Sequence, residues 1–290
     1  MIFSKSWNAH VLCCISCKNR TKMRNRCIVL VWVLACVVHV AAQDVADLDV
    51  SFPTEAETEV DASPKLSKEV AAEVKVVPLA ASVTLVTVGA VGISNGWMCK
   101  VKTNVRDGLQ GWREDGHRYF HADDYLQYFP LVVNVGLGFT GIKSKHDFRE
   151  RLAVSATATL FHVGMTQGLK WIVDEERPNA RNSRSFPSGH TSWAFMGAEL
   201  IREEYGWAWG TGAYAFASTI AFLRLYNNEH WLNDVLAGAG FGILSARLAY
   251  LLLPLERRLF RWDKTSATTV VVPTFGPYEH SVGLALNITY

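Results

Sequence analysis

Apolar segments of helical length follow one another along the chain, with short polar stretches between them. Segments of this length and content are typical of helices that bury one face against a shared core. We therefore predict an all-α fold, a six-helix bundle within a helical domain over residues 76–262. The predicted helices cover residues 76–94, 125–142, 152–173, 191–203, 211–225 and 234–253.

The segment before these helices, residues 43–75, is rich in Asp, Glu, Ala, Val and Ser and has no sustained apolar stripe. It also contains Pro53 and Pro64. A chain of this composition buries too little apolar surface to fold by itself, so we predict an acidic, flexible linker.

The last residues, 263–290, change to a β-type sequence. Two stretches rich in β-branched residues, 268–274 and 281–290, flank the turn-forming Gly276-Pro277. The second stretch alternates apolar with small or polar residues, as a strand with one buried face does. The pattern predicts a C-terminal β-hairpin, which either packs on the helical domain or anchors the protein to an outer-membrane barrel or to lipid.

The start of the chain has the layout of a secretory signal peptide. Two arginines after Met23 precede an apolar run at 27–40, and the small residues Ala41 and Ala42 follow it. We predict that Met23 is the true start and that residues 1–42 are an N-terminal extension and signal peptide. An uncleaved membrane anchor is the alternative.

The helical segments differ in their suitability for a membrane. A spanning helix needs about 20 predominantly apolar residues. Residues 152–173 and 234–253 come closest, whereas the segment near residue 200 carries Glu199, Arg202 and Glu203. The mean hydropathy of +0.09 is low for six spans. We therefore expect a bundle that is partly embedded in a membrane or peripheral to it.

Composition excludes some classes of partner. The chain has 29 basic and 27 acidic residues, a net charge of +2, so it offers no large basic surface to a nucleic acid. Its cysteines and histidines lack the regular spacing of a zinc site. No nucleic acid, metal or cofactor is expected.

Three short clusters carry the candidate chemistry. Phosphoryl transfer needs fixed positive charges around the phosphate oxygens, a nucleophile in line, and a proton for the leaving oxygen. Arginine, lysine and histidine supply these groups. The clusters are Lys170 and, after six residues, Arg177-Pro178; the run Pro187-Ser188-Gly189-His190; and Arg224, His230 and Asp234, separated by five and three residues.

Within these clusters each residue type has a physical reason to be present. Backbone N–H groups around Ser188 and Gly189, at the start of a predicted helix, suit an anion. His230 and Asp234 are four residues apart, so they share a helix face if both are helical. Asp234 can then hold one ring nitrogen of His230 while the other faces phosphorus, and His190 can protonate the leaving oxygen.

In these clusters the sequence resembles the type 2 phosphatidic acid phosphatase superfamily, which also contains bacterial acid phosphatases and vanadium haloperoxidases. The resemblance covers about residues 125–254. It implies that His230 is the nucleophile, that His190 and Asp234 are catalytic, and that the remaining cluster residues bind phosphate. Leu223 departs from the Ser or Ala that many members have before the arginine. The phosphate-binding set is Lys170, Arg177, Ser188, Gly189 and Arg224.

The resemblance implies a phosphatase that acts through a phosphohistidine, without a metal, on a lipid phosphate or lipid pyrophosphate at a membrane. Lipid A, at the 4′ or 1 position, is the first specific expectation. Undecaprenyl pyrophosphate and phosphatidylglycerophosphate are alternatives, and so is a soluble periplasmic acid phosphatase. A vanadate-dependent haloperoxidase and an inactive envelope module are further alternatives from other classes.

Other charged residues fit no such pattern. Asp174, Glu175 and Glu176 are adjacent, so their side chains do not converge on a metal, and we expect them on an exposed face. The remaining histidines considered are interpreted as structural: His117, His121, His146 and His162.

The predicted location is the bacterial cell envelope, with the active site facing the periplasm. A basic stretch precedes the helix at 152–173 and by the positive-inside rule favours the cytoplasmic side. An exported N-terminus is compatible with this only if residues 76–94 do not cross the membrane. The basic stretch contains Lys143, Lys145, His146, Arg149 and Arg151.

Overall fold

The computed structural model describes residues 64–111, 119–260, 262, 268–276 and 281–289. The predicted signal peptide at 1–42 and the first part of the predicted linker lie outside the described residues. Contacts divide the chain into two units, Met1–Leu251 and Leu252–Tyr290.

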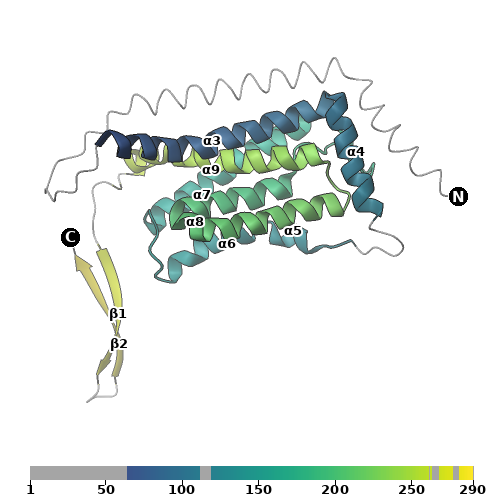
Figure 1. Cartoon of the computed structure of the whole chain (residues 1–290). Coiled ribbons are helices and arrows are strands. Elements are labelled where there is room, and N and C mark those ends of the chain that lie inside the picture. Colours follow the sequence, from purple (N-terminus) through teal and green to yellow (C-terminus); the bar gives the residue numbers. More distant parts are fainter. Residues whose placement is uncertain (1–63, 112–118, 261, 263–267, 277–280, 290) are drawn as a thin grey trace. The chain divides into compact units, whose positions relative to one another are not determined.

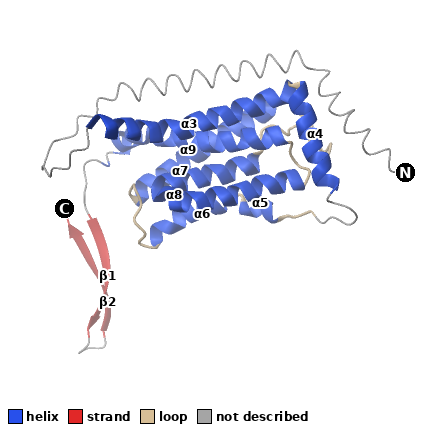
Figure 2. Ribbon diagram, in the orientation of Figure 1, coloured by secondary structure: helices blue, strands red, loops and turns tan. Residues whose placement is uncertain are grey.

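The described elements of the first unit are helical, and the last helix continues into the second unit (Figures 1 and 2). In chain order the elements are α3 (Pro64–Ser94), α4 (Gly96–Gly111), α5 (Ala122–Leu126), α6 (Phe129–Gly136), the 3₁₀ helix η1 (Leu137–Phe139), α7 (Phe148–Ile172), α8 (Gly189–Tyr226) and α9 (Leu232–Phe260).

The all-α prediction is confirmed, and the differences lie in where helices begin and end. The helix expected from residue 76 begins at Pro64, inside the predicted linker. Pro is favoured in the first turn of a helix, and the Lys, Glu and Ala residues that follow are good helix formers. The helix expected at 125–142 is divided into α5, α6 and η1.

Two predicted helices, 191–203 and 211–225, are the two arms of α8. The arms meet at Gly206, whose φ of 79° and ψ of −176° are not helical. Glycine lacks a Cβ and adopts a positive φ without steric cost, so the chain turns back on itself here. Small residues let the two arms pack closely, since Ala194, Ala198 and Ala217 are all buried in one cluster with Ile220.

The helix α4 was not predicted. Its apolar residues Trp97, Val101, Val105 and Leu109 are spaced four apart, which is a helical pattern that the sequence did offer. In the structure α4 lies across the end of the bundle at which α3 ends and α9 begins (Figure 1).

The main core joins α3, α7 and α9. Close contact between α3 and α9 depends on glycine, because a Cβ on Gly89 would lie 2.6 Å from the backbone oxygen of Asn233. The helix α9 therefore starts directly against α3, and its first turn is fixed. The buried residues of this core are Val86, Ala90, Ile93, Leu169, Val173, Phe186, Ala237, Phe241 and Leu244.

Two helices are long and apolar enough to cross a membrane by length and composition, Val77–Ser94 within α3 and Leu232–Phe260. The second matches the predicted segment 234–253, whereas residues 152–173 do not pass the same test. The arrangement in which residues 76–94 do not cross stays a prediction.

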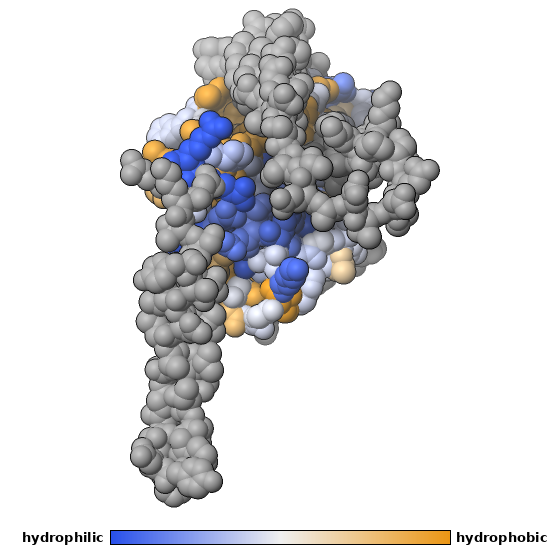
Figure 3. Space-filling view, turned by 90° about the vertical axis from the view of Figure 1, so that its left-hand side faces the viewer, coloured by the Kyte–Doolittle hydropathy of each residue, from blue (hydrophilic) through white to orange (hydrophobic). Residues whose placement is uncertain are grey.

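At the end of the bundle where α8 bends, hydrophilic surface lies between more apolar regions (Figure 3). The segment that leads into α7 carries exposed charges here, namely Lys143, Lys145, Asp147 and Arg149. This is the end remote from α4 (Figure 1).

The second unit contains two antiparallel strands, β1 (Thr268–Gly276) and β2 (Ser281–Thr289). Their register pairs Thr268 with Thr289 and Gly276 with Ser281. The turn at 277–280 lies outside the described residues, so the complete hairpin and its role stay predictions.

Candidate active site

The predicted site residues gather at one end of the bundle, the end covered by α4 (Figure 1). Lys170 is in the last turn of α7, His190 in the first turn of α8 and Arg224 in its last turn, while Asp234 opens α9. The bend of α8 brings its two ends together, since the first arm runs the length of the bundle and the second arm returns. Residues far apart in the sequence thereby share one site.

His230 lies in the short connection between α8 and α9 and is buried. Its Nδ1 is 3.5 Å from Oδ2 of Asp234, so the two side chains meet although His230 precedes α9 and the pair does not share a helix face. Asp234 is itself held firmly, because its Oδ2 accepts a short hydrogen bond from the hydroxyl of Ser185 and another from the backbone N–H of Trp231 at 2.9 Å. A carboxylate beside Nδ1 favours the tautomer with its proton on Nδ1, which leaves the lone pair on Nε2.

The turn before α8 packs against the same aspartate. The backbone N–H of Ser188 donates to the backbone oxygen of Asp234 at 3.0 Å. Gly238 makes this approach possible, because a Cβ there would lie 2.5 Å from the backbone oxygen of Ser188. A Cβ on Gly189, by contrast, would meet nothing within 4 Å. The helix start at Gly189 is thus open on the side from which an anion can reach its N–H groups.

Two arginines are held by one buried carboxylate, Glu229. Arg177 places Nη1 2.5 Å from Oε2 of Glu229, and Arg224 places Nη2 3.8 Å from the same oxygen. Nε of Arg224 is buried and has no protein acceptor among the described residues. That donor remains available to a phosphate oxygen.

Lys170 differs from the arginines in its partner. Its ammonium donates to the backbone oxygen of Arg184 at 3.1 Å, and the structure records no carboxylate contact for it. Burial, and then the positive charge of Arg177, lower the pKa of Lys170 to about 8. A dianionic phosphate would favour the charged form of this lysine.

The positive charges of the site converge on His230. Burial is the main reason that the pKa of His230 lies well below its usual value, and the charges of Lys170, Arg177 and Arg224 lower it further. All three cations are therefore close enough to His230 to act on it. The result is a neutral imidazole, the form that can attack phosphorus.

His190 faces the site beside a carboxylate on α5. Its Nε2 lies 3.1 Å from Oδ1 of Asp124, which also contacts Arg224 at 3.3 Å. Burial, and then the charge of Arg224, lower the pKa of His190 to about 4. The charge of a bound phosphate would act in the opposite direction and favour the protonated, acidic form.

Several residues of this site were not anticipated. Glu229 holds the two arginines, although it directly precedes His230 in the sequence. Asp123 pairs with Arg224 at 2.5 Å, and Ser185 bonds to Asp234. The carboxylates on α5 had no signal in the spacing of the motifs, because only the bend of α8 brings them to Arg224.

Two expectations about neighbouring residues are corrected or refined. Glu175 was expected on an exposed face but is only 1% exposed, because it pairs with Lys102 at 2.6 Å. Asp174 is exposed, as expected. His162 is buried and bonds to the hydroxyl of Ser192 at 2.8 Å, in keeping with a structural role, and His117 lies outside the described residues. Within the described part of the chain, no group of three His, Cys, Asp or Glu side chains is arranged to hold a metal.

This constellation of three cations, two histidines and an aspartate on a helical bundle defines a site suited to phosphate. Residues 151–258 match the model of the PAP2 superfamily. This match overlaps the residues in which the motifs resemble the type 2 phosphatidic acid phosphatase superfamily, and it confirms that resemblance for this part of the chain.

The chain is similar to a lipid A 1-phosphatase from Porphyromonas gingivalis, with 34% identity over 154 residues. The match covers 51% of this chain and 34% of that protein, so the chain matches about a third of its relative's length.

Two crystal structures are also similar to this chain. Aquifex aeolicus LpxE gives a TM-score of 0.39 at 20% identity, covering 52% of this chain and 94% of that one. The first transmembrane PAP2 type phosphatidylglycerolphosphate phosphatase from Bacillus subtilis gives a TM-score of 0.33 at 22% identity, covering 67% and 89%. With TM-scores below 0.5, these two likenesses add nothing to the assignment.

Proposed function

We propose that this protein is a phosphatase that removes phosphate from a lipid, with lipid A as its substrate, through a covalent phosphohistidine at His230. The observation that carries the proposal is the convergence of Lys170, Arg177 and Arg224 on a buried, neutral histidine whose Nδ1 faces Asp234. These cations stabilise the charge on the transferred phosphoryl group, which in many phosphatases is the task of a metal.

In the first step Nε2 of His230 attacks phosphorus. The bond between phosphorus and the lipid oxygen breaks, and protonated His190 gives its proton to that oxygen. Asp234 accepts from Nδ1 of His230 and so stabilises the positive charge that develops on the ring. The open N–H groups at the start of α8 and the free Nε donor of Arg224 bind the phosphate oxygens.

The second step reverses the roles. His190, now neutral, takes a proton from water while the water oxygen attacks phosphorus. The bond between Nε2 and phosphorus breaks, inorganic phosphate leaves, and His230 returns to its neutral form. Asp124 is placed to stabilise the protonated form of His190 during this exchange.

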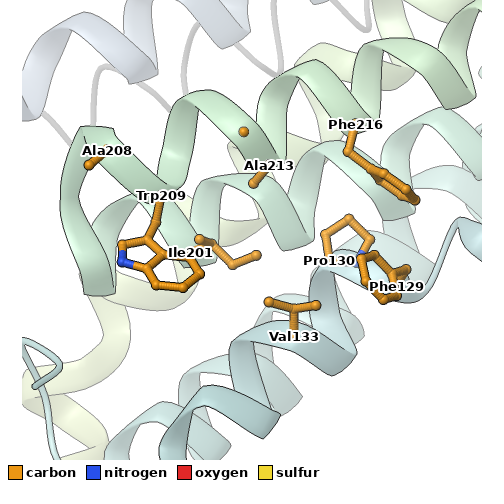
Figure 4. Close-up of a pocket in the computed structure, with 9 residues that line it drawn as sticks. Phe129, Pro130, Val133, Ile201, Ala208, Trp209, Ala213 and Phe216 are labelled. Atoms are coloured by element: carbon orange, nitrogen blue, oxygen red, sulfur yellow. The ribbon is translucent and has the colours of Figure 1, made fainter. Parts of the chain in front are cut away.

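An apolar pocket of about 270 Å³ between α6 and α8 supports a lipid substrate (Figure 4). The elements that line it also lead to the site, because α6 follows the carboxylates of α5 and the two arms of α8 begin and end at the site. The pocket is of a size and polarity that fit one acyl chain. Its lining residues are Phe129, Pro130, Val133, Ile201, Ala208, Trp209, Gly212, Ala213 and Phe216.

The choice of lipid A rests on the similarity to the Porphyromonas gingivalis relative, whose name specifies the 1-phosphate. A panel of purified lipid phosphates tests it: lipid A with a 1-phosphate, lipid A with a 4′-phosphate, phosphatidylglycerophosphate and undecaprenyl pyrophosphate. We expect the highest kcat/KM for the 1-phosphate. If another lipid of the panel is preferred, the assignment as a phosphatase stands and the assigned substrate changes.

The pocket can be tested separately. Ala213→Trp fills it, and we expect kcat/KM for lipid A to fall at least tenfold while hydrolysis of para-nitrophenyl phosphate is unchanged. Ala215→Trp is the matched control, because Ala215 is exposed on the same helix and does not line the pocket. Equal losses of activity on both substrates would show that the pocket does not bind the lipid.

The chemistry is tested at His230. We expect His230→Ala to abolish turnover, and labelled substrate to leave its phosphate on His230 in the parent protein. EDTA should not reduce the rate with a soluble substrate. Labelling of a different residue, or loss of activity on chelation that Mg²⁺ or Zn²⁺ restores, would contradict the mechanism.

We also propose that the site faces the periplasm. The exposed basic residues Lys143, Lys145 and Arg149 lie at the end of the bundle remote from the site, which agrees with a cytoplasmic position for that end. Cysteines introduced at Ser144 and at Asn182 test this with a membrane-impermeant thiol reagent, using the unmodified protein as the blank. We expect labelling at position 182 and protection at 144, and the reverse result would place the site in the cytoplasm.

A further inference from the structure

A buried chain of polar contacts leads from the candidate nucleophile to α4, a helix outside the matched domain. Lys102 on α4 is 4% exposed, and its ammonium lies 2.6 Å from Oε1 of Glu175, which is 1% exposed. The amide of Asn233 donates to both oxygens of Glu175, at 3.2 and 3.1 Å. The same amide nitrogen lies 3.2 Å from Oδ1 of Asp234, the residue that faces His230.

These contacts place two buried carboxylates, Glu175 and Asp234, on one amide group. Two negative charges so close together disfavour each other's ionised form. Burial raises the pKa of Glu175 to about 7, and the positive charge of Lys102 opposes this shift and favours the ionised form. No other cation contacts Glu175 among the described residues. Loss of the ammonium would drive a proton onto the pair, and Asp234 would then lose its fixed position or its negative charge.

The helix α4 also contacts the segment that carries His230. Nε of Arg106 donates to the side-chain oxygen of Asn228 at 3.2 Å. The ammonium of Lys102 and the guanidinium of Arg106 lie over the ring of Trp231, at 5.1 and 5.9 Å from its centre. The residues on both sides of His230 are therefore in contact with α4.

We propose that Lys102, acting through Glu175 and Asn233, is a positioning residue for the nucleophile His230. This proposal rests on the proposed function, in which Asp234 orients the ring. Lys102 touches neither His230 nor the phosphate-binding residues, so its effect is on the rate of the chemical step and not on substrate binding.

Three variants of the full-length protein test the proposal. Lys102→Met removes the ammonium and leaves Glu175 unpaired. Lys102→Met combined with Glu175→Gln removes both charges but keeps an oxygen that accepts from Asn233. Lys100→Met is the matched control, since Lys100 is exposed on the same helix and undergoes the same chemical change.

Two measurements separate positioning from a merely structural role. The first is the division of the effect between kcat and KM, with lipid A 1-phosphate as substrate and correction for the folded fraction. The second is the ¹⁵N spectrum of the histidine rings without substrate, in which the signal of His230 is assigned by its absence in His230→Gln. This spectrum reports which ring nitrogen carries the proton, and it does not depend on activity.

We expect Lys102→Met to lower kcat at least tenfold with KM within twofold, and to change the protonation pattern of His230. The double variant should recover to within threefold of the parent kcat, and Lys100→Met should match the parent. An unchanged kcat and spectrum in folded Lys102→Met would overturn the proposal, as would a double variant no more active than the single one. If the parent protein hydrolyses no phosphate, the proposed function fails, and the spectrum alone then decides whether Lys102 positions His230.

Discussion

The two ends of the helical unit both bury many charges, but they use them differently. At the end where α8 bends, Glu199 accepts from Nε and Nη2 of Arg202 at 2.7 Å each and from the hydroxyl of Tyr214. Glu204 likewise accepts from His146 and from Tyr250. Every one of these carboxylates has its donors within the protein.

At the site end the pairing is incomplete. Lys170 meets only a backbone oxygen in the contacts that the structure records, and Nε of Arg224 has no acceptor among the described residues. Asp124, which contacts both Arg224 and His190, is more than a third exposed, so a phosphate can displace it. The comparison teaches that buried charge alone does not mark a binding site. Donors without a protein acceptor mark it only where they gather with other cations around a histidine, since Nε of Arg151 at the other end is also buried without an acceptor among the described residues.

The largest expected effect of this difference is on activity at Lys170. Lys170→Met should lower kcat/KM about 10²–10³-fold, because it removes a cation that stabilises the transferred phosphoryl group. Its thermal midpoint should change little, since no carboxylate is left unpaired. Steady-state kinetics and a thermal scan on the same preparation check both parts, and a large loss of stability would show that Lys170 is structural like Arg202.

The opposite result is expected at the bend of α8. Arg202→Met removes both guanidinium hydrogen bonds to buried Glu199, and breaking a buried pair costs about 3–5 kcal/mol. The thermal midpoint should fall by roughly 10 °C, at about 2–4 °C per kcal/mol for a protein of this size. The kcat of the folded fraction should stay at the parent value. A selective loss of kcat would contradict a purely structural network.

A smaller effect on kcat/KM is expected from pH, and it tests the role of Lys170. Its pKa is lowered to about 8 by burial and by Arg177, so the ammonium loses its proton as the pH rises through 8. Phosphate then loses a partner, and kcat/KM should fall about tenfold per pH unit above that value. Lys170→Arg keeps its charge throughout, so its profile should lack this alkaline decline. A decline shared by both proteins would assign it to another group.

The smallest effect on stability and activity is expected for an exposed lysine at the end where α8 bends. Lys145 is 52% exposed and pairs with Glu203 at 2.5 Å. Exposed ion pairs contribute about 0–1 kcal/mol, so Lys145→Gln should leave both the urea midpoint and kcat/KM nearly unchanged. A loss of stability comparable with that of Arg202→Met would mean that this exposed ion pair stabilises the fold as much as the buried pair does.

The grouping of the candidate site residues could be predicted from the sequence because much of it depends on local spacing. His230 and Asp234 are four residues apart, and their side chains meet although His230 lies in the connection just before α9. Ser188 caps α8 and Gly189 begins it, so the helix start predicted beside these residues is present. The roles of these residues stay predictions, whereas their proximity is now a property of the fold.

The residues that hold the site in place could not be predicted, because their partners are distant in the sequence. Asp123 and Arg224 are 101 residues apart and meet only because α8 turns back at Gly206. Lys102 and Glu175 are 73 residues apart, and burial of a pair of opposite charges leaves no periodic pattern in a chain. A charged residue is predicted to be exposed as long as its partner is unknown, which is why Glu175 was assigned to the surface.

The sequence by itself determined the helical class, the resemblance to a phosphatase superfamily and the candidate site residues, since these follow from composition and from spacings of a few residues. Only the tertiary structure decided that two predicted helices are arms of α8 and that α4 closes the end of the bundle. It also decided which buried charges retain donors for a ligand. The physical reason is that ion pairing and packing depend on distances in space, and a chain of helices fixes those distances only when its long-range contacts form.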